Sequence, residues 1–449
     1  MTTTTDPSVS HQDLPRRIGF WGASAIMIGI VIGSGIFASP TSIAKQMGSP
    51  VLILSLWLLG GVIAFFGALT YSELATRYPR SGGVYVFLRE GLGRPVAFVF
   101  GWTYMLLTKP FAAAGIAIVG AEHLHMLLGY EGDVRLTTAA VIVFFTAINT
   151  PGVRGAMGVA AVLTSLKVAA LLAIVLIGVA LGQGNAANFV AQEAPKPIYL
   201  ALAPVLAAIM WTYDGWSDVG AIAGEVKEPQ RTLPRVYLIG TVAVTALYMA
   251  VNAIYFWLIP LEQMKTSSTL APVIMEMLVG PAGATVVTVL VVVSTFGATH
   301  GSIMTGARVT FAQARDGLLF KALGHVHQRW QTPAVALWVQ AALSVLAVYM
   351  AGSFQKLASG FVFTMWIFYG LAGLTLFVFR ARGDAAAPFR CPGYPVVPAL
   401  FVASAFGVVV LQVVSEPLET LPWMVVLAAG FPVYWVWTRF FGGGRPRAA

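Results

Sequence analysis

Residues 210–218 read Met-Trp-Thr-Tyr-Asp-Gly-Trp-Ser-Asp, and they place two carboxylates and a glycine inside an otherwise apolar segment. A charged residue at the centre of a membrane-spanning helix costs at least about 2.5–3.5 kcal/mol. Such a segment is tolerated where it lines a cavity, so we expect the helix to be broken here. A capped or paired structural carboxylate is the alternative reading of Asp214, and this stretch alone leaves it open.

A second interruption lies near the N-terminus, where residues 26–37 read Ile-Met-Ile-Gly-Ile-Val-Ile-Gly-Ser-Gly-Ile-Phe. Each glycine weakens a helix by about 1 kcal/mol relative to alanine. A close helix-packing contact would also explain Gly33-Ser34-Gly35. The two interruptions, however, fall in the first and sixth apolar spans, which begin the two five-span halves. This pairing points to an inverted-repeat transporter with its binding site near the midplane of the membrane.

Two broken helices at one site predict the kind of ligand. Unwinding leaves backbone N–H groups unsatisfied at the start of one half-helix, where the dipole is positive, and these groups suit a carboxylate. Free carbonyl groups at the end of the other half-helix suit an ammonium group. An α-amino acid zwitterion carries both groups.

Composition places these motifs in a membrane protein. Of 449 residues, 58% are hydrophobic and 10% are charged, against roughly 25% charged residues in soluble domains. Because a span needs about 20 apolar residues, we expect an all-α integral membrane protein with twelve transmembrane helices. The expected spans are 18–46, 50–76, 95–121, 136–152, 155–181, 198–226, 232–260, 281–311, 333–351, 357–379, 394–415 and 421–440.

These spans form one transmembrane domain, 16–441, between a disordered cytoplasmic tail at 1–15 and a second tail at 442–449. Its first repeat covers about 16–182, its second about 198–380, and helices 11 and 12 about 394–441.

The net charge of +9 reflects topology. If both termini are cytoplasmic, the cytoplasmic segments hold twenty of the 27 lysines and arginines, and the outside holds five. This is the bias of the positive-inside rule, so we expect an inner-membrane protein and no nucleic-acid partner. The single cysteine, Cys391, lies in a cytoplasmic loop and cannot form an internal disulfide.

The sequence resembles the L-type amino acid transporter family of the amino acid–polyamine–organocation (APC) superfamily. The resemblance covers nearly the whole chain. It rests on residues 33–37 (Gly-Ser-Gly-Ile-Phe), 213–216 (Tyr-Asp-Gly-Trp), 224–235 (Gly-Glu-Val-Lys-Glu-Pro-Gln-Arg-Thr-Leu-Pro-Arg), 109–110, 302–317 and 392–395. It implies a five-plus-five inverted-repeat core with broken helices 1 and 6, followed by helices 11 and 12.

The resemblance also implies a binding site. The backbone at Gly33, Ser34 and Gly35 would receive the substrate carboxylate, and Trp211 would cover the substrate from outside. The amino group would meet carbonyl groups near Val31, Trp211 and Asp214. Trp366 would form part of the pocket wall. The expected substrate-binding residues are Val31, Gly33, Ser34, Gly35, Thr108, Ala112, Trp211, Tyr213, Asp214 and Trp366.

Lys167 lies in the middle of span 5 with about ten apolar residues on either side. Snorkelling to an interface is the alternative, but Lys167 resembles the lysine that occupies the sodium position in sodium-independent family members. Its ammonium could bridge carbonyl groups of span 1 and a span 8 hydroxyl such as that of Ser302. We also expect a structural role for Lys109 beside Pro110, and a packing role for His300.

The chain departs from the family at three places. The family usually has asparagine after the span 6 tryptophan, where this chain has Ser217 and then Asp218, and it often has asparagine where this chain has His300. Animal members pair with a heavy chain through a cysteine between spans 3 and 4, but residues 121–135 contain none. We therefore expect a stand-alone, bacterial-type member without a disulfide-linked heavy chain.

The function expected from these features is sodium-independent exchange of neutral, small to medium α-amino acids, without a cofactor or metal. The pocket wall, which also draws on Phe111 and Ile116, is uncharged. A cationic amino acid exchanger is the alternative, because a carboxylate at Asp214 contacts the side chain in family members that accept cationic substrates. Proton-coupled symport is also open. An enzyme would need a converging nucleophile and base or a metal cluster, and the sequence indicates neither. A channel would need polar pore-lining helices, and none is visible in the sequence.

Overall fold

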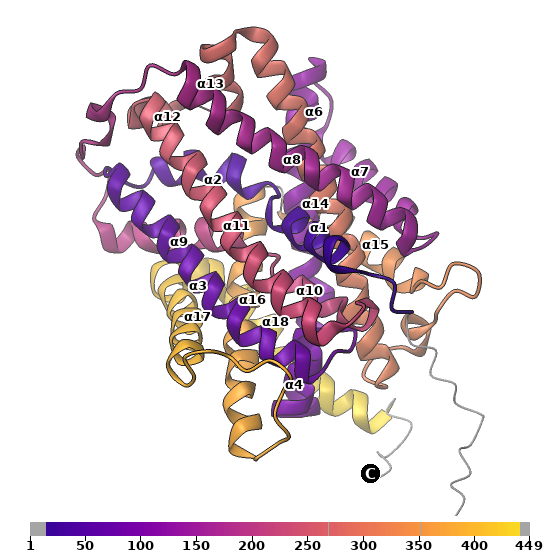
Figure 1. Ribbon diagram of the computed structural model, residues 1–449. Helices are drawn as coiled ribbons and strands as arrows, with labels where there is room; N and C mark the ends of the chain where they lie inside the picture. Colours follow the sequence, from indigo (N-terminus) through magenta and orange to yellow (C-terminus); the bar gives the residue numbers. More distant parts are fainter. Residues whose placement is uncertain (1–14, 268, 352, 441–449) are drawn as a thin grey trace, which may run out of the picture.

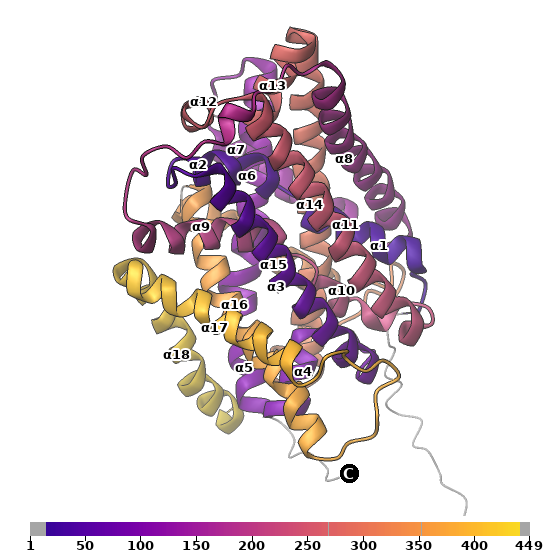
Figure 2. The same ribbon diagram turned by 60° about the vertical axis from the view of Figure 1, so that its left-hand side comes forward.

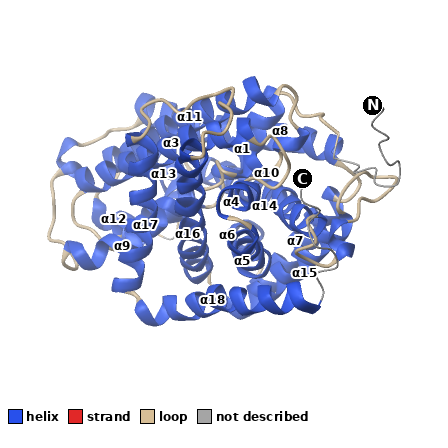
Figure 3. Cartoon of the chain, turned by 90° about the horizontal axis from the view of Figure 1, so that it is seen from below, coloured by secondary structure: helices blue, strands red, loops and turns tan. Residues whose placement is uncertain are grey.

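The computed structural model describes residues 15–440 apart from positions 268 and 352, so the predicted tails lie outside it except for Pro15. Within this part the chain is helical and has no strand; a single backbone bridge joins Ile18 and Val226 (Figures 1 and 3). Ten helical stretches are long and apolar enough to cross a membrane, and α7, α9 and α13 are apolar but shorter. The prediction of an all-α membrane protein is confirmed, and the count of twelve spans stays a prediction.

The first half of the chain runs from α1 to α8. Its helices are α1 (Phe20–Val31), α2 (Gly35–Ala44), α3 (Pro50–Arg77), α4 (Val84–Leu92), α5 (Arg94–Thr103), α6 (Lys109–Leu128), α7 (Val134–Asn149) and α8 (Val153–Leu181). A π-helical turn, Tyr104–Thr108, joins α5 to α6. The first span is thus two helices, as the glycines predicted.

The second half of the chain also begins with a broken span. It consists of α9 (Ile198–Tyr213), α10 (Asp218–Ala221), α11 (Pro229–Leu258), α12 (Leu261–Thr266), α13 (Leu270–Val279), α14 (Pro281–Arg315), α15 (Ala334–Ala351) and α16 (Phe354–Ala381). The last two helices, α17 (Val396–Ser415) and α18 (Pro417–Phe440), lie along one side of the bundle (Figure 2). There α17 packs on α16, α3 and α9, and α18 packs on α5.

The start of α1 is fixed to the segment that follows α10. Arg17 and Ile18 donate backbone N–H groups to the carbonyl of Glu225, and Lys227 donates to that of Ile18. The Glu225 carboxylate in turn accepts from Arg308 of α14 at 2.9 Å, and both side chains are buried. The two broken spans are therefore joined at one end of the bundle.

Candidate functional site

The two helix breaks face each other because each contains a glycine that allows close approach. A methyl group added at Gly35 would lie 2.7 Å from the Cα atom of Thr212 in α9. One added at Gly215 would lie 2.7 Å from the Ile30 side chain in α1, and Gly215 also has a φ of +108°. Residues that carry a side chain rarely adopt that φ. The glycines thus hold the unwound segments together.

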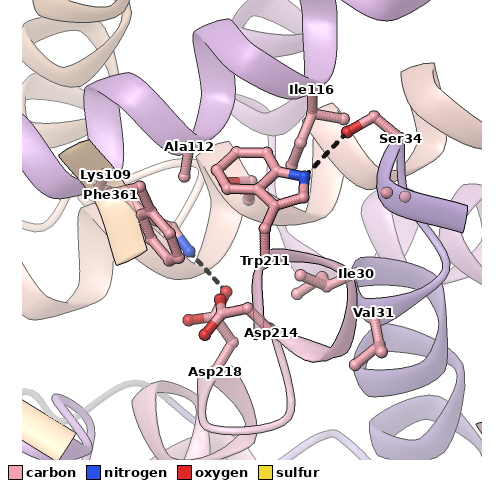
Figure 4. A pocket seen from close by; sticks show the side chains of 13 residues that line it. Ile30, Val31, Ser34, Lys109, Ala112, Ile116, Trp211, Asp214, Asp218 and Phe361 are labelled. Atoms are coloured by element: carbon pink, nitrogen blue, oxygen red, sulfur yellow. Dashed lines mark hydrogen bonds and ion pairs between the residues drawn. The ribbon is translucent and has the colours of Figure 1, made fainter. Parts of the chain in front are cut away.

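A small cavity lies between these segments (Figure 4). Its volume is about 30 Å³, far below the roughly 300–1,000 Å³ of ordinary ligand pockets. The Trp211 indole lines it and donates from Nε1 to the Ser34 hydroxyl at 3.4 Å. The site is therefore narrow. It is lined by Ile30, Val31, Gly33, Ser34, Gly35, Lys109, Ala112, Ile116, Trp211, Asp214, Asp218, Ser302 and Phe361.

The N-terminus of α2 opens onto this cavity. Ser34 is its N-cap residue, and the Ser34 side chain makes no capping hydrogen bond. The first N–H groups of a helix have no acceptor within the helix, and the helix dipole makes this end positive. Gly33, Ser34 and Gly35 all line the cavity. This end can receive an anion such as a carboxylate.

The C-terminal carbonyl groups of α1 are already engaged. The Val31 carbonyl accepts from the Tyr248 hydroxyl and from the Gly33 N–H, each at 2.8 Å. The fully buried Lys167 ammonium donates to the carbonyls of Gly29 at 2.6 Å and Ile32 at 2.8 Å. Lys167 therefore lies behind the end of α1, outside the cavity lining, and fixes the unwound backbone with a positive charge.

Ser302 does not share these carbonyls with Lys167, contrary to the expectation from the sequence. The α14 hydroxyl that does so belongs to Ser294, which donates to the Ile32 carbonyl at 3.2 Å. Ser302 is eight residues further along α14, about 12 Å at the helical rise. Its side chain lines the cavity instead.

The other wall of the cavity carries charge. The Asp214 Oδ1 atom accepts from the Tyr369 hydroxyl at 2.7 Å, and that hydroxyl also contacts Ser217 Oγ at 2.6 Å. Asp218 forms an ion pair with Lys109, with 2.5 Å between Oδ2 and Nζ. This ion pair was not among the expectations from the sequence. Two opposite charges within apolar spans were the available signal, because intramembrane charges are usually paired.

Four expected pocket residues do not line the cavity. Phe361 of α16 lines it, and Trp366, five residues on and about 140° further around the helix, packs against Tyr369 and Phe401 instead. Phe361 was not among the residues expected from the sequence, and it occupies the wall in place of Trp366. The others pack elsewhere: Thr108 on Thr364, Tyr213 on Trp57 and Tyr248, and Phe111 on Trp423.

His300 packs against Phe145 in the interior of the helix bundle. Its two ring nitrogens have no hydrogen-bond partner among the described residues. The described part also contains no group of three or more His, Cys, Asp or Glu side chains placed to hold a metal ion.

The two broken helices, the uncapped N-terminus of α2 and the buried Lys167 form one arrangement, and comparison with known proteins names it. The amino acid permease family matches residues 18–436 of this chain. The chain belongs to that family. The resemblance to L-type transporters seen in the sequence is thus confirmed.

Several characterised relatives of this permease align along most of its length. It is 30% identical to the b(0,+)-type amino acid transporter 1 of Mus musculus over 99% of this chain and 92% of that protein. It is 30% identical to the serine/threonine exchanger SteT of Bacillus subtilis (strain 168), over 94% and 97%. The cystine/glutamate transporter of Homo sapiens is also 30% identical, over 96% and 87%. The permease is therefore a multi-pass amino acid transporter and not an enzyme.

Proposed function

We propose that this permease exchanges neutral, small to medium α-amino acids across the inner membrane without sodium. The observation that carries the proposal is the uncapped N-terminus of α2 at a cavity that also holds the Asp214 carboxylate. The helix end suits the substrate carboxylate. The Asp214 carboxylate suits the ammonium group, so the two sides match a zwitterion.

Sodium independence is inferred from Lys167. Its ammonium donates to the carbonyls of Gly29 and Ile32, so it occupies the place where a cation would meet those oxygens. A fixed positive charge there repels a sodium ion. Exchange, rather than proton-coupled symport, is supported by the Bacillus relative, which is a serine/threonine exchanger.

The preference for a neutral side chain is inferred from the remaining wall. Ala112, Ile116, Trp211 and Phe361 are uncharged, and the cavity is small. Such a wall accommodates apolar or small hydroxyl side chains. The serine/threonine specificity in the name of the Bacillus relative agrees with this proposal.

A cationic amino acid is the second candidate, and Asp214 favours it. Asp214 has a neutral partner, the Tyr369 hydroxyl, whereas Asp218 is paired with Lys109. An ammonium or guanidinium side chain would form a charge-assisted hydrogen bond with the Asp214 carboxylate.

Exchange in proteoliposomes tests both candidates. Labelled serine uptake against internal serine is measured in sodium and in choline, with and without a pH gradient, and unlabelled amino acids compete from outside. We expect equal uptake in sodium and choline, no drive from the pH gradient, and competition by serine and alanine above that by lysine and arginine. If lysine or arginine competes better, and Asp214→Asn removes that preference, the cationic reading holds.

The proposed topology has twelve spans in two inverted repeats, about 16–182 and 198–380, with both termini in the cytoplasm. It is supported by the matching order of helices in the two halves and by the lysine and arginine bias. We also propose that no heavy chain is attached by a disulfide. The sole cysteine, Cys391, is buried in the segment between α16 and α17.

A further inference from the structure

The ion pair between Lys109 and Asp218 forms part of the cavity wall and has no part in the zwitterion site proposed above. Its ammonium and carboxylate are 2.5 Å apart, and both side chains are buried, at 6% and 8% exposure. Asp218 Oδ2 also accepts from the Thr305 hydroxyl of α14 at 2.8 Å. Figure 4 shows the pair beside the Asp214 carboxylate.

The backbone directs Lys109 to this place. Pro110 has no N–H group to donate to Leu106, and the helix forms a π-helical turn immediately before it. The Lys109 N–H consequently donates to the Tyr104 carbonyl, five residues back. Such π-helical turns occur frequently at functional sites.

Gly306 of α14 leaves room for the lysine side chain. A methyl group at Gly306 would lie 2.3 Å from Lys109 Cγ and 2.5 Å from Gln340 Oε1. Lys109 of α6 therefore reaches the cavity past Gly306 of α14.

The pair decides which charge a substrate side chain meets. Lys109, Asp214 and Asp218 are the charged residues in the described cavity lining, and together they carry one formal negative charge. Lys109 is the one cation among them, and its ammonium is paired with the Asp218 carboxylate. A substrate with an anionic side chain thus meets Asp214 and finds no available cation. Without the Asp218 carboxylate, the ammonium would face the cavity uncompensated.

We propose that Asp218 is a specificity-determining residue that excludes amino acids with anionic side chains by sequestering Lys109. Removing the Asp218 charge releases the ammonium, which then receives a side-chain carboxylate. Removing the Lys109 charge leaves two carboxylates, which favour a cationic side chain. This inference rests on the proposed amino acid exchange and names the substrate class that the same site rejects.

The test uses competition by glutamate and by lysine against serine exchange in proteoliposomes, expressed as the ratio of their half-inhibitory concentrations. Asp218→Asn preserves the shape of the side chain and is expected to improve glutamate relative to lysine by about tenfold or more, which corresponds to about 1.4 kcal/mol. Lys109→Gln is expected to shift the ratio in the opposite direction.

Two further variants separate sequestration of Lys109 from simple loss of negative charge. Asp214→Asn has the same formal charge as Asp218→Asn but leaves Lys109 paired, so it is expected to improve glutamate less. Lys109→Gln combined with Asp218→Asn has the wild-type formal charge and is expected to return the wild-type ratio. If Asp218→Asn is not recovered as a folded protein, Lys109→Gln and the double variant decide the question.

The proposal is overturned if Asp218→Asn exchanges serine with an unchanged ratio, if Asp214→Asn improves glutamate equally, or if the double variant keeps the altered ratio. Failure of the proposed function looks different. A wild-type protein that prefers lysine contradicts the neutral reading, yet the shift caused by Asp218→Asn is still measured against that baseline. A wild-type protein that exchanges no amino acid contradicts both.

Discussion

At the scale of single residues, Lys167 is the side chain on which the unwound end of α1 depends. Carbonyl groups at a helix end need donors, and the lysine supplies two hydrogen bonds to them from a fully buried position. Thr164, one turn earlier on the same helix, donates to the Ala25 carbonyl at 2.8 Å. Together they attach α8 to α1 along its length.

Replacing Lys167 by alanine is expected to reduce serine exchange at least about tenfold. The Gly29 and Ile32 carbonyls would lose the ammonium, and the Ile32 carbonyl would keep the Ser294 hydroxyl. A buried carbonyl left without a donor costs about 1–3 kcal/mol, so the unwound segment should lose its geometry at Gly29. Exchange per inserted protein in proteoliposomes is the measurement. Lys356→Ala, which removes an exposed lysine of α16, is the matched control and should exchange normally. Wild-type exchange by Lys167→Ala would contradict this role.

At the scale of helices, the site depends on the contact between α2 and α9. Gly35 touches the backbone of Thr212, and the Thr212 hydroxyl donates to Ser39 of α2 at 2.8 Å. The contact therefore combines close backbone approach with a hydrogen bond. It sets the position of the α2 N-terminus relative to Trp211.

Gly35→Ala is expected to separate these helices, because the new methyl group would lie 2.7 Å from the Thr212 Cα atom, which is part of the backbone. Overpacking of this kind costs about 1–3 kcal/mol, so the protein should melt earlier in detergent and lose most serine exchange. Gly407→Ala in α17 is the control, since nothing lies within 4 Å of its added methyl group. Equal melting temperatures for the two variants would show that the contact can relax.

At the scale of the whole molecule, arginines gather at one end of the bundle. A cavity of about 830 Å³ at this end is lined by residues that include Arg16, Arg77, Arg80, Arg89 and Arg315. Arg89 is paired with Asp316, and Arg380 with Glu73. Glu73 also accepts from the Cys391 N–H at 2.7 Å, so the cysteine belongs to this end.

Cys391 therefore reports the orientation of the protein, and we expect a membrane-impermeant maleimide to label it only from the cytoplasmic side. Burial raises the pKa of its thiol to about 11, and the nearby Glu73 carboxylate adds to the effect. The thiolate is the reactive form. Labelling of inside-out vesicles should therefore be slow at pH 7, and it should accelerate about tenfold for each unit by which the pH rises toward the pKa. Cys391→Ser is the control for specificity. Rapid labelling of intact cells would contradict the topology.

The sequence by itself determined where the two spans break and what kind of molecule surrounds them. Gly33 and Gly35 weaken a helix. The carboxylates of Asp214 and Asp218, on either side of Gly215, are unfavourable in an apolar span. The structure breaks α1 after Val31 and α9 after Tyr213, where these residues begin. These are local properties, so local chemistry was sufficient to predict them.

The tertiary structure alone decided which side chains face the cavity and which charges meet. Phe361 rather than Trp366 lines the wall, Ser294 rather than Ser302 shares a carbonyl with Lys167, and Lys109 pairs with Asp218. These outcomes depend on the rotation of each helix about its axis and on the register between helices. Residues 109 positions apart in the chain form the ion pair, and the packing of neighbouring helices, rather than sequence spacing, fixes that rotation and register.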